Sequence, residues 1–369
     1  MRRIVFTGGG TGGHIIPNIA VIQKLKEKYK NLEMLYIGSK HGPEEKLIKR
    51  TGIDFKSVFT GKYRRYFSFS NFIDFFKVPW GIWQAYKILK RYKPNVVFSK
   101  GGFVSIPVVY AAKLLKLPIV LHESDVTPGL ANRLASKKAN FLCLAHFESQ
   151  RYFPAKINKV VTGNPIREMV LKGDKQRGYQ ITGFNNKSPV ILVMGGSSGA
   201  QHINDEMALA INALVPNYQI LHICGKGKTE KAIPLAETNR FKYRIYEYVE
   251  DELPDFYAIS DLVITRAGAN SLAEIEALNI PAIIVPIGKA ASRGDQITNA
   301  FLYQEKHPDT KVIEDELLSY KALIHLINAL VPYGNFIKEE RTIPKTSDAV
   351  EKIIGVLDLY LGESCDVGE

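Results

Sequence analysis

Short apolar runs alternate with longer amphipathic segments along most of this chain of 369 residues. Apolar runs of about 4–8 residues are typical of buried strands. In the first half, the predicted strands are Arg3–Thr7, Glu33–Gly38, Asn95–Ser99, Pro118–His122, Phe141–Leu144 and Lys159–Thr162. The predicted helices between them are Asn18–Tyr29, Phe72–Lys90, Ser105–Leu115 and Leu130–Ser136. This repeated order predicts a parallel, doubly wound sheet.

The pattern pauses at Gly163 and in the polar stretch Lys172–Lys187, and then begins again. The second half contains Val190–Met194, Asn204–Leu214, Gln219–Cys224, Leu262–Thr265, Ser271–Leu278 and Ala282–Val285. Both halves open with a strand, a glycine loop and a helix. We therefore predict an α/β protein of two Rossmann-like domains, residues 1–163 and 164–345, whose parallel sheets face each other across a cleft. Residues 346–369, with the helix Ser347–Leu361, are expected to pack back on the N-terminal domain.

The first glycine loop, TGGGTGGHIIP, matches the dinucleotide fingerprint G-x-G-x-x-G through Gly8, Gly10 and Gly13. A nicotinamide site also needs an acid at the end of the second strand, about 20 residues further on. That strand ends in Gly38-Ser39, so the fingerprint is excluded. A phosphate-binding P-loop ending at Gly227-Lys228-Thr229 is excluded too, because His222 replaces its leading glycine.

The second glycine loop, Gly195–Ala200, lies between a predicted strand and a predicted helix. Glycines let backbone N–H groups approach an anion, and a helix N-terminus adds partial positive charge. A tight turn without a ligand is the alternative. Two such loops, one opening each domain, favour a diphosphate bound at the second.

His14 follows two glycines and precedes a helix that is expected to open near Pro17. We expect its imidazole to project from a strand end into the cleft. An unprotonated imidazole can take a proton from a sugar hydroxyl, which makes His14 a candidate general base. A purely structural histidine is the alternative.

The composition indicates which kind of partner the protein binds. The net charge of +12 and the pI near 9.3 indicate an anionic partner. Between Lys56 and Lys100, basic residues are interleaved with aromatic ones, a pattern that favours an anionic membrane surface over nucleic acid. From Phe72 onward these aromatics could equally line the core, whereas the loop Tyr63–Ser70 is expected to be exposed.

Three widely spaced cysteines, Cys143, Cys224 and Cys365, argue against a disulfide framework or a zinc site and fit a reducing cytoplasm. No signal peptide and no apolar stretch of about 18 residues is found. The sequence thus predicts a protein that is neither secreted nor transmembrane.

Several runs together resemble the MurG-type glycosyltransferases. They are TGGGTGGHIIP, SKGGFVSIP (99–107), HESDVTPGLANR (122–133), TGNPIR (162–167), GGSSGAQHIN (195–204), TRAGANSLAEIEALNIPAIIVPI (265–287) and SRGDQITNA (292–300). The resemblance implies a GT-B fold. It also implies transfer of N-acetylglucosamine from UDP-GlcNAc to undecaprenyl-linked lipid I, which gives lipid II for peptidoglycan. The location it implies is peripheral, at the cytoplasmic face of the cell membrane, in contact with other cell-wall synthesis proteins.

The resemblance also assigns site residues. It implies that His14 is the base, that Arg167 and Ser197 bind the diphosphate, and that Glu274 accepts both ribose hydroxyls. Further substrate-binding residues that it implies are Thr11, Gly12 and Gly13 in the first loop, Asp125, Asp295 and Gln296 at the donor sugar, Val249 at the uracil, and Ala269, Asn270, Ser271, Leu272 and Ala273 at the nucleoside and phosphate.

Two residues depart from the family pattern. Ser198 replaces the glutamine of GGSQGA, and Asp125 replaces a common asparagine. An aspartate cannot donate as an amide does, so its contacts with the sugar differ. We interpret these changes as a subfamily difference rather than a change of reaction.

No Asp-x-Asp pair for a diphosphate-bound Mg²⁺ is present. We therefore expect an inverting displacement without metal or cofactor, in which Arg167, helix N-terminal amides and the helix dipole meet the phosphate charge. Other hypotheses are a glycosyltransferase with a diacylglycerol acceptor, a UDP-GlcNAc epimerase of the same fold, and a non-catalytic UDP-sugar or membrane binder.

Overall fold

The computed structural model describes residues 2–40, 42–61, 69–196, 199–288, 294–333, 340–343 and 348–362, with the backbone alone for residues 69–77. The chain divides into two compact units. One contains Met1–Arg167 and Ser347–Glu369, and the other contains Glu168–Thr346. The sequence placed the divisions at 163/164 and 345/346, a few residues from these positions.

The described strands of the first unit form one parallel sheet in the order β3-β2-β1-β4-β5-β6-β7. The strands are β1 (Arg2–Thr7), β2 (Leu32–Ser39), β3 (Asp54–Val58), β4 (Val96–Ser99), β5 (Ile119–Glu123), β6 (Phe141–Leu144) and β7 (Asn158–Val161). From β1 the chain runs outward to β3 and then returns to β4 on the other side of β1. In α/β sheets, ligands bind at the carboxyl ends of strands beside such a switch point.

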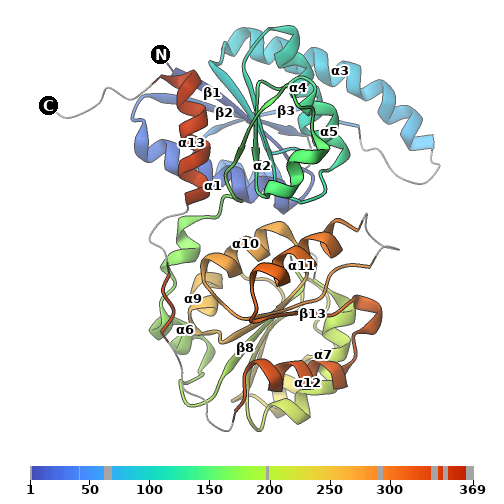
Figure 1. Ribbon diagram of the computed structural model, residues 1–369, viewed down its shortest axis with the longest axis vertical. Helices are drawn as coiled ribbons and strands as arrows, with labels where there is room; N and C mark the ends of the chain where they lie inside the picture. The colour runs from blue at the N-terminus through green and yellow to red at the C-terminus, as the bar shows by residue number, and fades with distance from the viewer. Residues whose placement is uncertain are drawn as a thin grey trace, which may run out of the picture. The chain divides into compact units, whose positions relative to one another are not determined.

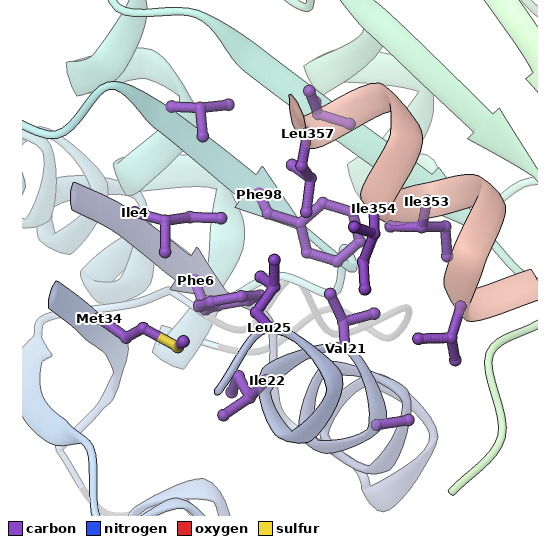
Figure 2. Close-up of a cluster of buried hydrophobic side chains, with 14 of the residues drawn as sticks. Ile4, Phe6, Val21, Ile22, Leu25, Met34, Phe98, Ile353, Ile354 and Leu357 are labelled. Carbon is purple, nitrogen blue, oxygen red and sulfur yellow. The ribbon is translucent and has the colours of Figure 1, made fainter. Parts of the chain in front are cut away.

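Helices cover both faces of this sheet (Figure 1). Ile4 and Phe6 face a core formed with α1 and α13, whereas Val5 faces a core formed with α3 and α4. Figure 2 shows Ile353, Ile354 and Leu357 of α13 on the first of these cores. The helical segments are α1 (Gly12–Lys28), α2 (Glu44–Lys49), α3 (Phe69–Tyr92), α4 (Ser105–Leu114), α5 (Leu130–Ser136), the 3-10 helix η1 (Phe147–Tyr152) and α13 (Asp348–Leu361).

The described strands of the second unit form a parallel sheet in the order β10-β9-β8-β11-β12-β13. They are β8 (Val190–Met194), β9 (Gln219–Ile223), β10 (Tyr243–Tyr246), β11 (Leu262–Thr265), β12 (Ala282–Ile284) and β13 (Thr310–Val312). Its helical segments are η2 (Glu168–Lys172), α6 (Lys175–Thr182), α7 (Gln201–Leu214), α8 (Ile233–Thr238), α9 (Leu253–Ile259), α10 (Ala269–Ala277), α11 (Asp295–Lys306), η3 (Asp315–Leu317) and α12 (Tyr320–Leu330).

The strands that the sequence did not predict lie at sheet edges. They are β3, β10 and β13, and β3 buries only Val58 fully. An edge strand lacks a neighbour on one side and does not need the continuous apolar run of a central parallel strand. The polar stretch 172–187 also contains a helix, α6, whose N-cap Asp174 accepts hydrogen bonds from the backbone of Gln176 and Arg177.

Among the described residues, no helix combines the length and the apolar character needed to cross a membrane.

Candidate functional site

The first glycine loop joins β1 to α1. The helix begins at Gly12 with Thr11 as N-cap, so His14 is its third residue. The prediction that the helix opens near Pro17 is wrong, because Pro17 lies inside α1. A proline fixes φ near the helical value, so there it costs one backbone hydrogen bond without starting the helix. His14 is half-buried and therefore accessible, and its backbone N–H donates to the carbonyl of Thr11 at 3.2 Å.

Buried polar groups hold the backbone of this loop. The Asn18 amide donates to the carbonyls of Thr7 and His14, both at 3.3 Å, and to the Tyr36 hydroxyl at 3.0 Å. Tyr36 in turn donates to the carbonyl of Gly8 at 2.8 Å. Burial raises the pKa of Tyr36, so its hydroxyl keeps the proton that it donates. The peptide groups around His14 are thereby fixed.

A carboxyl group lies directly behind the loop. Glu44 of α2 is 0% exposed, and its Oε1 accepts hydrogen bonds from the backbone N–H and the hydroxyl of Ser39 at 2.7 and 2.5 Å. A Cβ atom on Gly9 would lie 2.9 Å from the Glu44 carboxyl carbon. An acid therefore does follow the second strand. Because Glu44 is fully buried, it cannot contact a ribose, and the dinucleotide interpretation stays excluded.

A further pair of glycines, after β4, packs against the first loop. Gly102 has a φ of +78°, and a Cβ atom there would lie 2.4 Å from the carbonyl oxygen of Gly9 and 3.0 Å from Cδ2 of His14. A side chain at residue 102 would displace both groups. The position of the His14 ring thus depends on a glycine that is far away in the sequence.

Asp125 begins the loop that follows β5. Its backbone N–H and that of Ser124 donate to Oε1 of Glu123 at 3.0 and 2.8 Å. The other oxygen of Glu123 accepts from the Asn132 amide at 2.9 Å and from the N–H of Gly129 at 3.3 Å. Burial, with the Asp125 carboxyl nearby, raises the pKa of Glu123. Glu123 thus organises the loop that presents Asp125, which is half-buried.

Arg167 is the last residue of the N-terminal segment of the first unit and is 8% exposed. Its Nε atom is buried and has no hydrogen-bond partner in the described part of the chain. A buried guanidinium N–H without an acceptor costs free energy unless a ligand supplies one. This atom supports the anion-binding role expected for Arg167.

The second glycine loop follows β8, as expected. Gly195 and Gly199 pack closely against the chain, since a Cβ atom on Gly199 would lie 2.3 Å from the carbonyl oxygen of Cys224. Gly196 has a φ of +78°, and no described atom lies within 4 Å of its Cβ position. Space on the side-chain side of Gly196 is therefore open among the described residues, while its carbonyl accepts from the N–H of Gly199 at 2.9 Å. Ser197 and Ser198 lie outside the described residues, so their expected roles stay predictions.

The first turns of α10 contain the residues expected at the nucleoside: Ala269, Asn270, Ser271, Leu272, Ala273 and Glu274. Leu272 and Glu274 are buried, and the other four are half-buried. The hydroxyl of Tyr257, a fully buried residue of α9, donates to Oε2 of Glu274 at 3.1 Å. One carboxylate oxygen of the predicted ribose clamp is thus held by the protein.

Asp295 and Gln296 open α11. Oε1 of Gln296 accepts from the N–H of Ile287 at 3.2 Å, and Oδ1 of Asp295 is buried without a partner among the described residues. Val249 is buried in the segment between β10 and α9. The predicted residues of the second unit therefore lie after strands of its sheet or at the starts of its helices.

Functional reasoning from the sequence missed residues that hold the predicted ones. Lys100, His122 and Asn164 form a buried network at the carboxyl ends of β4 and β5. Glu44 and Tyr257 were missed as well. Lys100, His122 and Asn164 belong to the quoted runs SKGG, HESD and TGNP, but a sequence does not reveal that they meet.

The aromatic, basic segment is described only in part. Trp80 and Trp83 on α3 are 52% and 44% exposed and stack with ring centroids 4.6 Å apart. The Lys87 ammonium lies 3.6 Å from the centroid of the Trp83 ring. These two tryptophans therefore do not line the core. Of the loop predicted to be exposed, Tyr63–Ser70, residues 63–68 lie outside what the structure describes, and residues 69 and 70 begin α3. The side chains of Phe75 and Phe76 lie outside the described residues as well.

No cluster of three or more His, Cys, Asp or Glu side chains suited to a metal ion is found among the described residues.

Comparisons with known proteins decide the family. Residues 4–142 match the glycosyltransferase family 28 N-terminal domain, and residues 190–353 match its C-terminal domain. The chain belongs to glycosyltransferase family 28. Within this family, it is 45% identical over 361 residues to the UDP-N-acetylglucosamine--N-acetylmuramyl-(pentapeptide) pyrophosphoryl-undecaprenol N-acetylglucosamine transferase of Clostridium tetani, covering 97% of this chain and 98% of that protein. The protein of the same name from Lachnoclostridium phytofermentans is also 45% identical, over 97% of this chain and 99% of its own. These matches place the chain among the MurG-type members.

Solved structures agree on the fold. The crystal structure of MurG from Acinetobacter baumannii matches with a TM-score of 0.71 and 24% identity, over 98% of this chain and 99% of that one. A UDP-GlcNAc 2-epimerase from Neisseria meningitidis matches with a TM-score of 0.64 and 14% identity, over 97% and 99%. The expected GT-B fold, with two parallel-sheet α/β units, is confirmed. Because family 28 transferases and epimerases share it, the fold alone does not select the reaction.

Proposed function

We propose that this protein transfers N-acetylglucosamine from UDP-GlcNAc to undecaprenyl-linked lipid I and thereby makes lipid II for peptidoglycan synthesis. The observation that carries the proposal is the 42–45% identity, over nearly the whole chain, to transferases whose names state this reaction. A fold shared with epimerases would not have been sufficient.

The residues of the first unit perform the acceptor chemistry in this proposal. The His14 imidazole takes the proton from the 4-hydroxyl of the muramoyl sugar, and that oxygen attacks the anomeric carbon of the donor. UDP leaves from the opposite face, so the anomeric configuration inverts. Two observations support this role. His14 is half-buried, and its backbone donates to the Thr11 carbonyl and accepts from the Asn18 amide.

Donor binding falls mainly to the second unit. Glu274 accepts hydrogen bonds from the ribose, Val249 meets the uracil through its backbone, and Asp295 and Gln296 contact the donor sugar. The negative charge that develops on the departing diphosphate is met by Arg167, by the amides around Gly196, and by the N-terminal end of α10. The open space at the Cβ position of Gly196 and the unpartnered Nε of Arg167 support these roles.

An acceptor assay tests the reaction. The protein is incubated with UDP-GlcNAc and either a lipid I analogue or diacylglycerol, with and without EDTA. We expect transfer to lipid I alone, at the same rate with EDTA, because the mechanism uses no metal. Transfer only to diacylglycerol, or release of free ManNAc without a lipid acceptor, would replace this function by another.

We also propose that the protein binds the cytoplasmic face of the cell membrane as a peripheral protein. The exposed pair Trp80 and Trp83 beside Lys87 supports this, since aromatic and basic side chains bind lipid headgroups together. Changing both tryptophans to Ser should release the protein from vesicles that contain anionic lipid, without unfolding it. Unchanged cosedimentation with these vesicles would argue against this face.

A further inference from the structure

Lys100 follows β4 directly and is 1% exposed. Its backbone N–H donates to the carbonyl of Thr7 at 3.0 Å, next to the first glycine loop. Its ammonium group reaches the other way, to Nδ1 of His122 at 2.7 Å, to Oδ1 of Asn164 at 3.0 Å and to the hydroxyl of Ser124. Lys100 thus joins the loop that carries His14 to the loop that carries Asp125.

The hydrogen bonds of this cluster indicate a charged lysine. Nε2 of His122 lies 2.9 Å from the carbonyl oxygen of Gly163, which can only accept, so Nε2 carries the ring proton and Nδ1 accepts. The Ser124 hydroxyl donates to Oδ1 of Asn164 at 3.0 Å and accepts from Lys100. Lys100 therefore faces three acceptors. An ammonium has three donors for them, whereas an amine has only two.

The surroundings nevertheless disfavour the charge. The three acceptors are neutral, and no ion pair among the described residues includes Lys100. Burial lowers the pKa of Lys100, while the carboxyls of Glu123 and Asp125 and the thiol of Cys143 raise it. Burial and the Lys100 charge lower the pKa of His122, with His146 acting in the same direction, so His122 is neutral. Lys100 should therefore lose its proton at a lower pH than an exposed lysine does.

We propose that protonated Lys100 is a positioning residue, which locks the Ser124–Gly129 loop with Asp125 against the glycine loop that carries His14. The role rests on the proposed transferase function. When Lys100 loses its proton, one of the three acceptors loses its donor and the loop is released. Because the charged form is the active one, this contribution to turnover is present below the pKa of Lys100 and lost as pH rises through it.

Lys100→Met is the direct test, because methionine fills similar volume without donors. A displaced loop should lower kcat for transfer about 10- to 100-fold, since small errors in the position of reacting groups carry costs of this order. The KM for UDP-GlcNAc should rise by a smaller factor than kcat falls, because Asp125 is one of several residues expected at the donor and most of the others lie in the second unit. The matched control is Lys113→Met, an exposed lysine on α4, which should behave as wild type. Wild-type kcat in Lys100→Met would overturn the proposal.

Asn164→Asp tests the charge and does not depend on whether Lys100→Met folds. A carboxylate in place of the amide gives the ammonium an ionic partner and should raise the pKa of Lys100 by about one to three units. The alkaline limb of the kcat profile should move to higher pH by the same amount. An alkaline limb that stays in place in a folded Asn164→Asp protein would contradict a role for the Lys100 charge.

Lysine-selective ¹³C NMR of the substrate-free protein separates this inference from the transferase function. With Lys100→Arg for assignment, the Lys100 Cε signal should titrate at least about one unit below the usual lysine value near 10.4. An ordinary pKa would overturn the inference whatever the enzyme does. A wild-type protein that shows the low titration but transfers nothing to lipid I would contradict the proposed function alone.

Discussion

The two glycine loops open the two units with similar sequences, but the structure uses them differently. In the first, a Cβ atom on Gly9 would meet the Glu44 carboxyl group, and one on Gly10 would lie 2.4 Å from Phe103. The absence of a side chain at these glycines leaves space for other side chains of the protein. In the second, Gly195 and Gly199 also pack closely, but Gly196 faces open space among the described residues.

This difference teaches that a glycine pattern fixes a backbone path and not a ligand. A buried carboxyl group behind the first loop is a poor setting for a phosphate, whereas the open space at Gly196 before α7 is a suitable one. The first loop positions a side chain, His14. In the second, the described residues leave space at Gly196. The first should therefore control turnover, and the second unit should control donor affinity.

The largest effect is expected at His14. His14→Ala removes the proposed base and should lower kcat by roughly 10²- to 10⁴-fold, with the UDP-GlcNAc KM nearly unchanged. Steady-state transfer to a lipid I analogue measures both constants. His325→Ala, at an exposed position on α12, is the control. Undiminished transfer by His14→Ala would remove the base assignment and favour a binding protein or another residue.

At Glu274, we expect the donor KM to change more than kcat, the reverse of the effect expected at His14. Glu274→Ala removes the proposed charged acceptor of the ribose hydroxyls and should raise the donor KM roughly 10- to 100-fold with a smaller change in kcat. Glu276→Ala, an exposed position on the same helix, is the matched control. A donor KM equal to that of the control would take Glu274 out of the site.

The loops themselves should differ in stability. Gly9→Ala forces a methyl group against the Glu44 carboxyl and should lower the free energy of unfolding by about 1–3 kcal/mol. Gly196→Ala has space, and its positive φ costs about 1 kcal/mol, but it should raise the donor KM. Urea unfolding measures both. As a contrast, Gly355→Ala inside α13 should stabilise the protein by up to about 1 kcal/mol. An equal loss of unfolding free energy in Gly9→Ala and Gly196→Ala, with equal donor KM values, would contradict a difference between the loops.

The smallest effect is expected behind the ribose clamp. Tyr257→Phe removes the hydrogen bond to Oε2 of Glu274 and should raise the donor KM about 2- to 10-fold, less than Glu274→Ala, because the carboxylate itself remains in place. The double variant with Glu274→Ala should show no additional increase, because the two residues act together. Additive effects would show that Tyr257 acts elsewhere.

Much of the fold was readable from the sequence. The central strands β1, β2, β4, β5, β8 and β11 were found within a residue or two, because parallel strands covered on both faces leave continuous apolar runs. The edge strands β3, β10 and β13 were missed because an edge strand needs no such run, whereas the edge strand β7 was found. The start of α1 was missed because Pro17 was read as a first-turn residue, although a proline can also follow several helical residues.

The site divides in the same way. His14 and Glu274 could be predicted as site residues because glycine loops, helix starts and family motifs are local in the sequence. Lys100 and Asn164 are 64 residues apart, and Tyr257 lies 17 residues before Glu274 on another helix. No periodicity links such pairs. The sequence by itself determined the order of the central strands and the family, since these follow from continuous apolar runs and from local motifs. Only the tertiary structure decided which buried polar groups meet, because that depends on how the parallel strands are ordered in the sheet.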